Sequence, residues 1–390
     1  MSTSSLPVEL WLEIFRWATL SLSTSSLCAT TFKPFEAASC TEGTDHDTVA
    51  VKRTLVRVCR LWRDLARDLL FEDVVISRNA PALQQALESG GVGREKYRRI
   101  RRACLPYLSC TSYNYKDSET VATLLQACPE LEILARPRTS ITYLGSEAMT
   151  FDYPTVDCPS LRSLKRLDWW HYNEAARCGG YNALTEVLRA APNLQYLSLG
   201  GDLWLNLMQR GSLELPALTT LRIRQMNVLF PQQVCRWSMP SLRNLIVDVA
   251  SSPHLLDSFS ERYGEQLKTI ELGKHLRFFV TDIVGYVFNS CPVLEELGYF
   301  VMFTAIPYQP LQPHPTLTTL RWHAAPNDLL SSKDLWSHLS QHAGVFTRSS
   351  FPALKRIVLH GSWDFALGDE RFLSIVKKLG EQGIEIQRLR

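Results

Sequence analysis

The 390-residue chain lacks any feature that would place it in a simple compositional class. It has no excess of charge, because 42 Lys and Arg residues face 39 Asp and Glu residues and leave a formal net charge of +3. No global field therefore favours nucleic acid or an anionic membrane as partner. Its 19 glycines and 20 prolines exclude a collagen-like chain, and ten cysteines are too few for a disulfide scaffold. With 45% hydrophobic residues, the chain is expected to form a packed globular protein rather than a disordered one.

Targeting signals are also missing. Residues 6–22 are largely apolar, but Glu9, Glu13 and Arg16 interrupt them, so they do not form a secretory signal. The longest uncharged stretch, 297–320, contains four prolines, which a lone membrane-spanning helix would not carry. We interpret its residues 297–314 as an extended loop at the rim of the fold. The sequence has no Asn-x-Ser/Thr site. We therefore expect a soluble intracellular protein, cytoplasmic and/or nuclear, with reduced thiols.

The motifs of common enzymes do not occur. There is no phosphate-binding or dinucleotide-binding glycine loop, no His-Glu-x-x-His and no Gly-x-Ser-x-Gly. The absence of Cys-x-x-Cys excludes zinc ribbons and RING-type sites. His338 and His342 stand four apart on an expected helix, but without a third ligand nearby a solvated helix face is favoured over a metal site. The sequence predicts a non-catalytic protein without cofactor or metal.

A short phrase, Pro-x-Leu-x-x-Leu-x-apolar, recurs along most of the chain. It reads PNLQYLSL at 192–199 and PTLTTLRW at 315–322. Its first leucine returns at intervals of 23 to 37 residues, and the middle of the series falls within the period of about 20–29 residues that is typical of leucine-rich repeats. These first leucines are Leu131, Leu164, Leu194, Leu218, Leu242, Leu267, Leu294, Leu317 and Leu354.

The repeated unit is expected to be a strand followed by a helix. The phrase alternates apolar and polar positions as a half-buried strand does, whereas 118–128, 181–191 and 281–291 have helical period and each ends before a proline. No such unit can bury its own apolar side, so the units must stack. The chain resembles an irregular leucine-rich repeat, with 96–105 as a degenerate first strand. This resemblance implies an α/β horseshoe solenoid over 76–390; a coincidental α/β domain is the alternative, which nine copies disfavour.

Two helical segments precede the repeats. Residues 6–18 place Leu6, Leu10 and Ile14 on one helical face, with Phe15 beside it. Residues 55–71 are predicted to form one amphipathic helix.

Cys59 and Trp62 of the second helix are expected in the core of the N-terminal domain rather than at a partner contact. Residues 19–50 separate the two helical segments and contain 12 Ser and Thr, so we interpret them as a flexible insertion, whose length costs little entropy.

The opening Leu-Pro-x-Glu-Leu and the later Val-Cys-Arg-x-Trp-Arg-x-Leu-Ala resemble an F-box, here over residues 1–75. The separation of the two phrases is longer than is usual in that family. The resemblance implies a substrate-recognition adaptor of an SCF-type cullin–RING ubiquitin ligase, in which the F-box docks on a Skp-type linker and, through it, on cullin and RING subunits. Apolar anchors in a groove suit such docking. The predicted linker contacts are Leu6, Pro7, Leu10, Ile14, Phe15, Val58 and Leu65.

The target protein is expected on the concave face of the repeats, where alternate strand residues point outward. Aromatic residues beside arginine are typical of protein interfaces. The predicted target-binding residues are Arg166, Asp168, Trp170, Tyr196, Arg222, Arg224, Arg321, His323, Arg356 and His360, with Ser198, Asp248, Glu271, Glu296 and Phe300 at equivalent positions. A scaffold unrelated to ubiquitin, whose N-terminal helices only cap the solenoid, is the alternative. An exposed face at Leu6–Phe15 would favour a partner site and a buried face would favour the cap.

Overall fold

The structure, a computed structural model, describes residues 6–19, 30–36, 46–76, 80–88, 100–107, 115–138, 157–202, 213–226, 229–249 and 255–388. The chain divides into two compact units. Unit 1 contains most of the chain up to residue 203, and unit 2 contains residues 218–390 together with 32–35 and 204–214. The two units are described separately.

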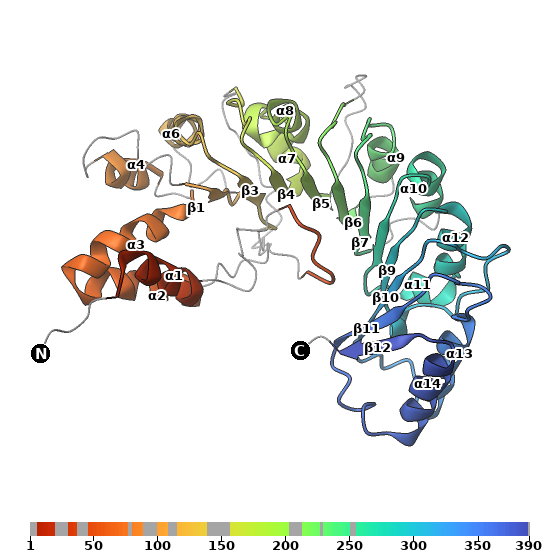
Figure 1. The fold of residues 1–390 in the computed structure, drawn as a ribbon. Helices are drawn as coiled ribbons and strands as arrows, with labels where there is room; N and C mark the ends of the chain where they lie inside the picture. Colours follow the sequence, from red (N-terminus) through yellow and green to blue (C-terminus); the bar gives the residue numbers. More distant parts are fainter. Residues whose placement is uncertain are drawn as a thin grey trace, which may run out of the picture. The chain divides into compact units, whose positions relative to one another are not determined.

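Unit 1 begins with three helices and continues with alternating strands and helices (Figure 1). Each described strand pairs in parallel with the next strand along the chain, from the first to the fifth. The strands are β1 (Asp73–Val75), β2 (Arg102–Cys104), β3 (Ile133–Arg136), β4 (Arg166–Tyr172) and β5 (Tyr196–Asp202). The helices are α1 (Val8–Thr19), α2 (His46–Val58), α3 (Arg60–Glu72), α4 (Ala80–Glu88), α6 (Tyr115–Ala127), α7 (Asn173–Ala176), η3 (Gly180–Asn182) and α8 (Leu184–Ala190).

Unit 2 repeats the strand–helix pattern, again with parallel pairing in chain order. Its strands are β6 (Thr220–Met226), β7 (Asn244–Val247), β8 (Thr269–Leu272), β9 (Glu296–Phe300), β10 (Thr319–Ala324), β11 (Arg356–Gly361) and β12 (Glu385–Arg388). Its helices are α9 (Leu229–Val234), α10 (Leu255–Tyr263), α11 (Leu276–Val280), α12 (Ile283–Ser290), η4 (Val301–Phe303), α13 (Ser332–Val345) and α14 (Glu370–Glu381). The prediction of a stacked α/β repeat is confirmed within each unit.

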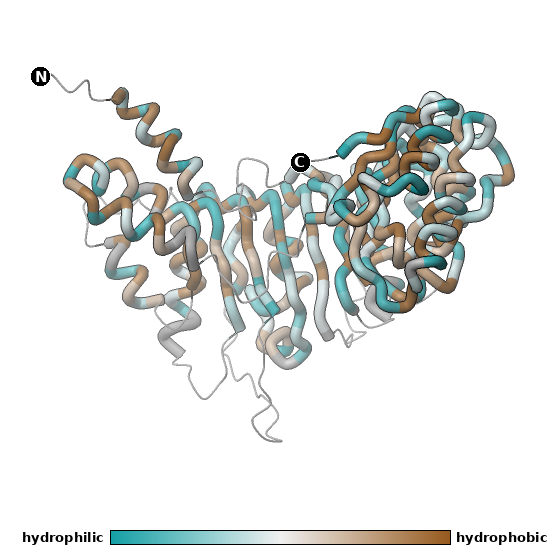
Figure 2. Tube along the Cα trace, turned by 90° about the horizontal axis from the view of Figure 1, so that it is seen from below, coloured by the Kyte–Doolittle hydropathy of each residue, from teal (hydrophilic) through white to brown (hydrophobic). Residues whose placement is uncertain are grey.

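The leucines of the repeated phrase form the core of each unit. Each of the nine first leucines is at most 1% exposed. In unit 2 the side chains on the helix side of the sheet include Trp322 and Tyr299, which are paired across β10 and β9. The Trp322 indole donates to the Tyr299 hydroxyl, which lies 3.3 Å from His342 Nδ1 on α13. Apolar and polar positions alternate along these strands (Figure 2), as is expected when helices cover one face.

The three N-terminal helices, α1 to α3, pack around a small aromatic core. Phe15 and Trp62 meet edge to face with their ring centroids 4.9 Å apart, and Trp11 lies 5.0 Å from Trp62. Leu55, Ala66 and Leu69 complete this core with Phe15. We call α1 to α3 the helix triad.

The structure corrects the predicted single helix over 55–71. Cys59 adopts an extended backbone between α2 and α3, and its Sγ accepts a hydrogen bond from the Trp62 N–H at 3.4 Å. Cys59 is therefore an exposed N-cap, not the core residue that we expected. Trp62 is partly buried against the core, as predicted.

Three other element boundaries differ from the predictions. Helix α2 begins at His46, inside the predicted insertion 19–50. The first strand of unit 1 is β1, directly after α3, rather than the predicted strand at 96–105, where β2 is second. Residues 297–303, which were expected to belong to an extended rim loop, form most of β9 and all of η4. Among the described residues, no helix is long and apolar enough to cross a membrane.

Candidate protein-binding surfaces

Helix α1 is apolar on two faces. Trp11 and Phe15 pack in the core of the helix triad, whereas Leu10, Ile14 and Trp17 are 49%, 45% and 70% exposed. A surface helix normally has a single apolar stripe that faces the core, so a second stripe is not needed for folding. The exposed stripe is the geometry expected of a helix that binds a partner through apolar anchors.

Most of the predicted linker contacts are exposed. Leu6 and Val58 are 43% and 55% exposed, and Pro7 is also exposed. Leu65 is only partly exposed and packs against the core. Phe15 is 1% exposed, so the expected contact role of Phe15 is corrected: this residue is part of the core.

In unit 1, the residues predicted to bind a target are covered rather than open. Arg166 forms an ion pair with Asp168 at 2.9 Å and another with Glu36 at 3.0 Å, and its guanidinium lies over the Tyr196 ring. The Tyr196 hydroxyl also lies 3.4 Å from the Glu36 carboxylate. Arg166, Asp168, Tyr196 and Ser198 are each at most 6% exposed. The prediction that these residues directly contact a target is therefore corrected.

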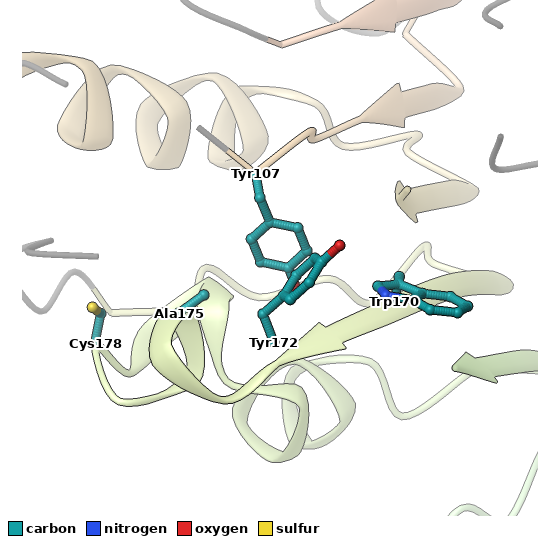
Figure 3. Close-up of a cluster of buried hydrophobic side chains, with 5 residues drawn as sticks. All are labelled: Tyr107, Trp170, Tyr172, Ala175 and Cys178. Atoms are coloured by element: carbon teal, nitrogen blue, oxygen red, sulfur yellow. The ribbon is translucent and has the colours of Figure 1, made fainter. Parts of the chain in front are cut away.

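Trp170 is likewise buried, although the strand pattern predicted that it faces a target. It belongs to a cluster with Tyr107, Tyr172, Ala175 and Cys178, in which the Tyr107 and Tyr172 rings meet edge to face at 4.9 Å (Figure 3). Ala175 lies on the short helix α7, directly after β4, and Cys178 follows that helix. Trp170 is therefore part of this buried cluster and is not open to a target.

In unit 2, charged side chains on the face away from the helices are paired across neighbouring strands. Arg222 donates from Nε and Nη2 to the two carboxylate oxygens of Asp248 at 2.8 and 3.0 Å. Arg321 forms an ion pair with Glu296. The mixed charge predicted for this face is present, but the charges of these four residues balance within the two ion pairs. Arg222 and Arg224 are each 6% exposed and Arg356 is exposed, so of these three only Arg356 is open to a target.

Three aromatic rings lie in one row on the same face. The strand register aligns Phe300 with His323 and His323 with His360, across β9, β10 and β11. The ring of Phe35, from the segment between α1 and α2, lies edge-on against all three, at centroid distances of 5.3, 4.8 and 4.9 Å. Burial lowers the pKa of His323, and it lowers the pKa of His360 to about 4, an effect that Arg321 reinforces. Both imidazoles are therefore neutral near pH 7.

Two further groups complete the contact around Phe35. The Phe35 N–H donates to the Glu271 carboxylate at 2.7 Å. A Cβ atom at Gly298, which pairs with Glu271 across β9 and β8, would lie 3.4 Å from the tip of the Phe35 ring. Burial raises the pKa of Glu271 to about 7, against the lowering effects of the Phe35 hydrogen bond and of Arg222. Asp248 and Glu296 add smaller raising effects. We call Glu271, Gly298, Phe300, His323 and His360 the aromatic socket.

The His338–His342 pair does not form the solvated helix face that we expected. Both residues are buried on α13, with their Nε2 atoms 3.1 Å apart. His338 Nε2 lies 2.9 Å from the Val301 carbonyl oxygen, and His342 Nε2 lies 3.1 Å from that of Thr304. Among the described residues, no group of three metal-ligating side chains occurs. The pair ties α13 to η4.

Unit 2 is expected to lose stability in acid because of this pair. Burial lowers the pKa of His342 to about 3, and His338 acts in the same direction. Below about pH 6.5, His342 binds a proton in the unfolded chain but not in the folded one. The free energy of unfolding therefore falls as pH falls. The cost of this residue at about pH 4.5 is about 2–3 kcal/mol. Urea unfolding at about pH 7 and 4.5 should therefore show a smaller acid loss for His342→Gln than for wild type; equal losses would contradict this.

Strand alternation identified residues that point away from the helices but not the residue that covers some of them. Phe300, His323 and His360 were predicted from strand alternation, whereas Phe35 lies in a Ser/Thr-rich segment that we interpreted as a flexible insertion. The only local signal was the sequence Phe-Lys-Pro-Phe-Glu at 32–36, an apolar cluster inside a polar stretch.

Comparisons with known proteins add little to this description. No protein-family model matches the chain, and no curated protein matches it. A crystal structure of a Bacteroides fragilis protein aligns with 84% of this chain and 76% of its own, with 13% sequence identity and a TM-score of 0.38. A likeness of this degree assigns neither a family nor a function to the chain.

Proposed function

We propose that the protein is a non-catalytic substrate-recognition adaptor of an SCF-type cullin–RING ubiquitin ligase. In this proposal the helix triad docks on a Skp-type linker subunit, and the repeats bind a target protein. The proposal depends on the resemblance of residues 6–10 and 58–66 to an F-box and on one structural observation, the exposed apolar stripe of α1.

That stripe has the size and chemistry of a helix-binding interface. Leu10, Ile14 and Trp17 follow one another at spacings of four and three residues, which keeps them on one side of the helix. Burying one large apolar side chain contributes about 1.5–3 kcal/mol. Two or three such anchors therefore supply much of the free energy of a stable complex.

The stripe also discriminates between the two functions considered from the sequence. Helices that served only to cap the solenoid would bury their apolar faces, and the inner face of α1 does so through Trp11 and Phe15. The outer face remains exposed, which favours a partner. A capping role is supported by the direct passage from α3 into β1, which places the helix triad beside the first strand of unit 1. Both roles are compatible in one helix triad.

The experiment measures binding of the purified full chain to a purified Skp-type linker by titration calorimetry. We expect wild type to bind and the double variant Leu10→Asp, Ile14→Asp to bind at least about 100-fold more weakly, because two buried anchors are replaced by charges. The variant should keep the unfolding midpoint of wild type, since neither side chain belongs to the core.

A matched control carries the same two charges at two exposed apolar residues of unit 2. Val280 and Leu311 are 81% and 86% exposed, so Val280→Asp, Leu311→Asp should bind the linker as wild type does. If wild type has no measurable affinity for the linker, the adaptor proposal is wrong and the capped scaffold is the better description.

A further inference from the structure

Phe35 occupies the aromatic socket in the manner of a bound ligand. Its ring is held edge-on by Phe300, His323 and His360, its tip reaches Gly298, and its backbone N–H is bound by Glu271. Glu271 is separated from Phe35 by 236 positions along the sequence. The socket thus recognises both an aromatic side chain and the main chain that carries it.

The backbone of Phe35 is held in an unfavourable conformation. Its φ of 53° lies in the left-handed region, and no other non-glycine residue among those described has a positive φ. For an L-residue with a Cβ atom this conformation is less stable than the right-handed one. Such strain persists only where surrounding contacts impose it, and it is common at switch and binding regions. The contacts of the socket are therefore strong enough to offset this cost.

The socket does not depend on Phe35 for its construction. Phe300, His323 and His360 are aligned by the parallel pairing of β9, β10 and β11, and Glu271 and Gly298 are aligned by the pairing of β8 and β9. These pairings are backbone interactions of unit 2. A different polypeptide with an aromatic side chain and a free main-chain N–H can make the same contacts.

We infer that the aromatic socket is a docking site for a phenylalanine-containing segment of a target protein, and that Phe35 is an internal competitor that closes it. The inference rests on the target-binding half of the proposed function and is independent of the linker-binding half. A target must displace Phe35, and release of Phe35 relieves the backbone strain. Because Phe35 is tethered to the socket by the chain itself, its effective concentration there is about millimolar. It therefore competes with a target and weakens target binding.

The chemistry of the socket selects its ligand. Three neighbouring rings favour an aromatic side chain, because edge-to-face ring contacts stabilise a complex beyond the apolar area that they bury. The Glu271 carboxylate accepts a main-chain N–H, which requires that the ligand residue is not proline.

The test uses a fluorescent peptide with the chain's own sequence, Thr-Thr-Phe-Lys-Pro-Phe-Glu, and measures its polarisation with full-length protein. Phe35→Ala empties the socket and is expected to bind the peptide at least about tenfold more tightly than wild type. Phe35→Gly, which also relieves the positive φ, serves as a second open variant should Phe35→Ala fail to fold. Phe32→Ala removes the other phenylalanine of the segment, which lies outside the row of rings, and should bind as wild type does.

Two losses are expected in the open variants. A peptide whose second phenylalanine is replaced by alanine should not bind, and a Gly298→Val exchange, which fills the space at the ring tip, should abolish binding of the original peptide. Equal binding by wild type and both open variants, or equal binding of the two peptides, would overturn the inference and leave Phe35 as a structural plug. Linker affinity, measured on the same open variants, reports separately on the proposed function, because the helix triad is unchanged in them.

Discussion

Replacing Phe15 by alanine is expected to destabilise the helix triad by about 3–5 kcal/mol, the range found for large aromatic side chains in well-packed cores. Phe15 is 1% exposed and makes ring contacts with Trp11 and Trp62, which come from two different helices. Its removal leaves a cavity between α1 and α3 and also deletes these edge contacts. Hydrogen exchange followed by mass spectrometry should detect faster exchange in α1 and α3.

The neighbouring residue provides the control. Ile14 is 45% exposed, so Ile14→Ala should change the free energy of unfolding by no more than about 0.5 kcal/mol, as is usual for surface positions. In linker binding we expect the larger direct loss of affinity from Ile14→Ala, because Ile14 is the proposed contact and Phe15 is part of the core. Comparable destabilisation by both variants would mean that α1 does not have an inner and an outer face.

Gly361→Ala is expected to destabilise unit 2 by about 2–5 kcal/mol. Gly361 ends β11 with a φ of 77°, a conformation that costs a residue with a Cβ atom about 1–2 kcal/mol. In addition, the new Cβ would lie 2.3 Å from the Ala324 carbonyl oxygen and 2.6 Å from a ring carbon of His323. Because the first of these atoms is backbone, β10 and β11 must separate, and such overpacking costs about 1–3 kcal/mol more.

Gly344→Ala is the matched exchange in the same unit. Gly344 lies on an exposed part of α13, with no positive φ and with open space within 4 Å of the point where an alanine Cβ would lie. Alanine there should stabilise the helix by about 0.5–1 kcal/mol. Thermal unfolding should thus give a midpoint several degrees lower for Gly361→Ala and slightly higher for Gly344→Ala. A Gly361→Ala midpoint equal to that of wild type would show that the two strands can separate at no cost.

Local patterns were sufficient for the architecture of the repeats. The Leu-x-x-Leu phrase has the period of a strand and the segments between have the period of a helix, and both periods follow from backbone geometry alone. The predicted helices at 118–128 and 281–291 correspond to α6 and α12, within a few residues at each end. The outer face of α1 was predicted in the same way, through the four-residue spacing of Leu6, Leu10 and Ile14.

Strand alternation could not tell which outward positions are open. It predicted that Arg166, Asp168 and Tyr196 point away from the helix side, but their burial depends on contacts such as that of Glu36, 130 positions from Arg166. Likewise, the spacing of His338 and His342 indicated a common helix face, whereas only the packing of α13 on η4 decided that this face is buried.

The strand–helix period, the parallel α/β repeat and the amphipathic face of α1 could be predicted from the sequence, because each follows from short-range spacing or from the recurrence of one phrase. That Phe15 lies in the core while Ile14 is exposed, and that Phe35 fills a socket of three rings, is evident only in the folded chain. Those outcomes depend on contacts between residues far apart in the chain, and no local period records which distant segment will cover a given strand.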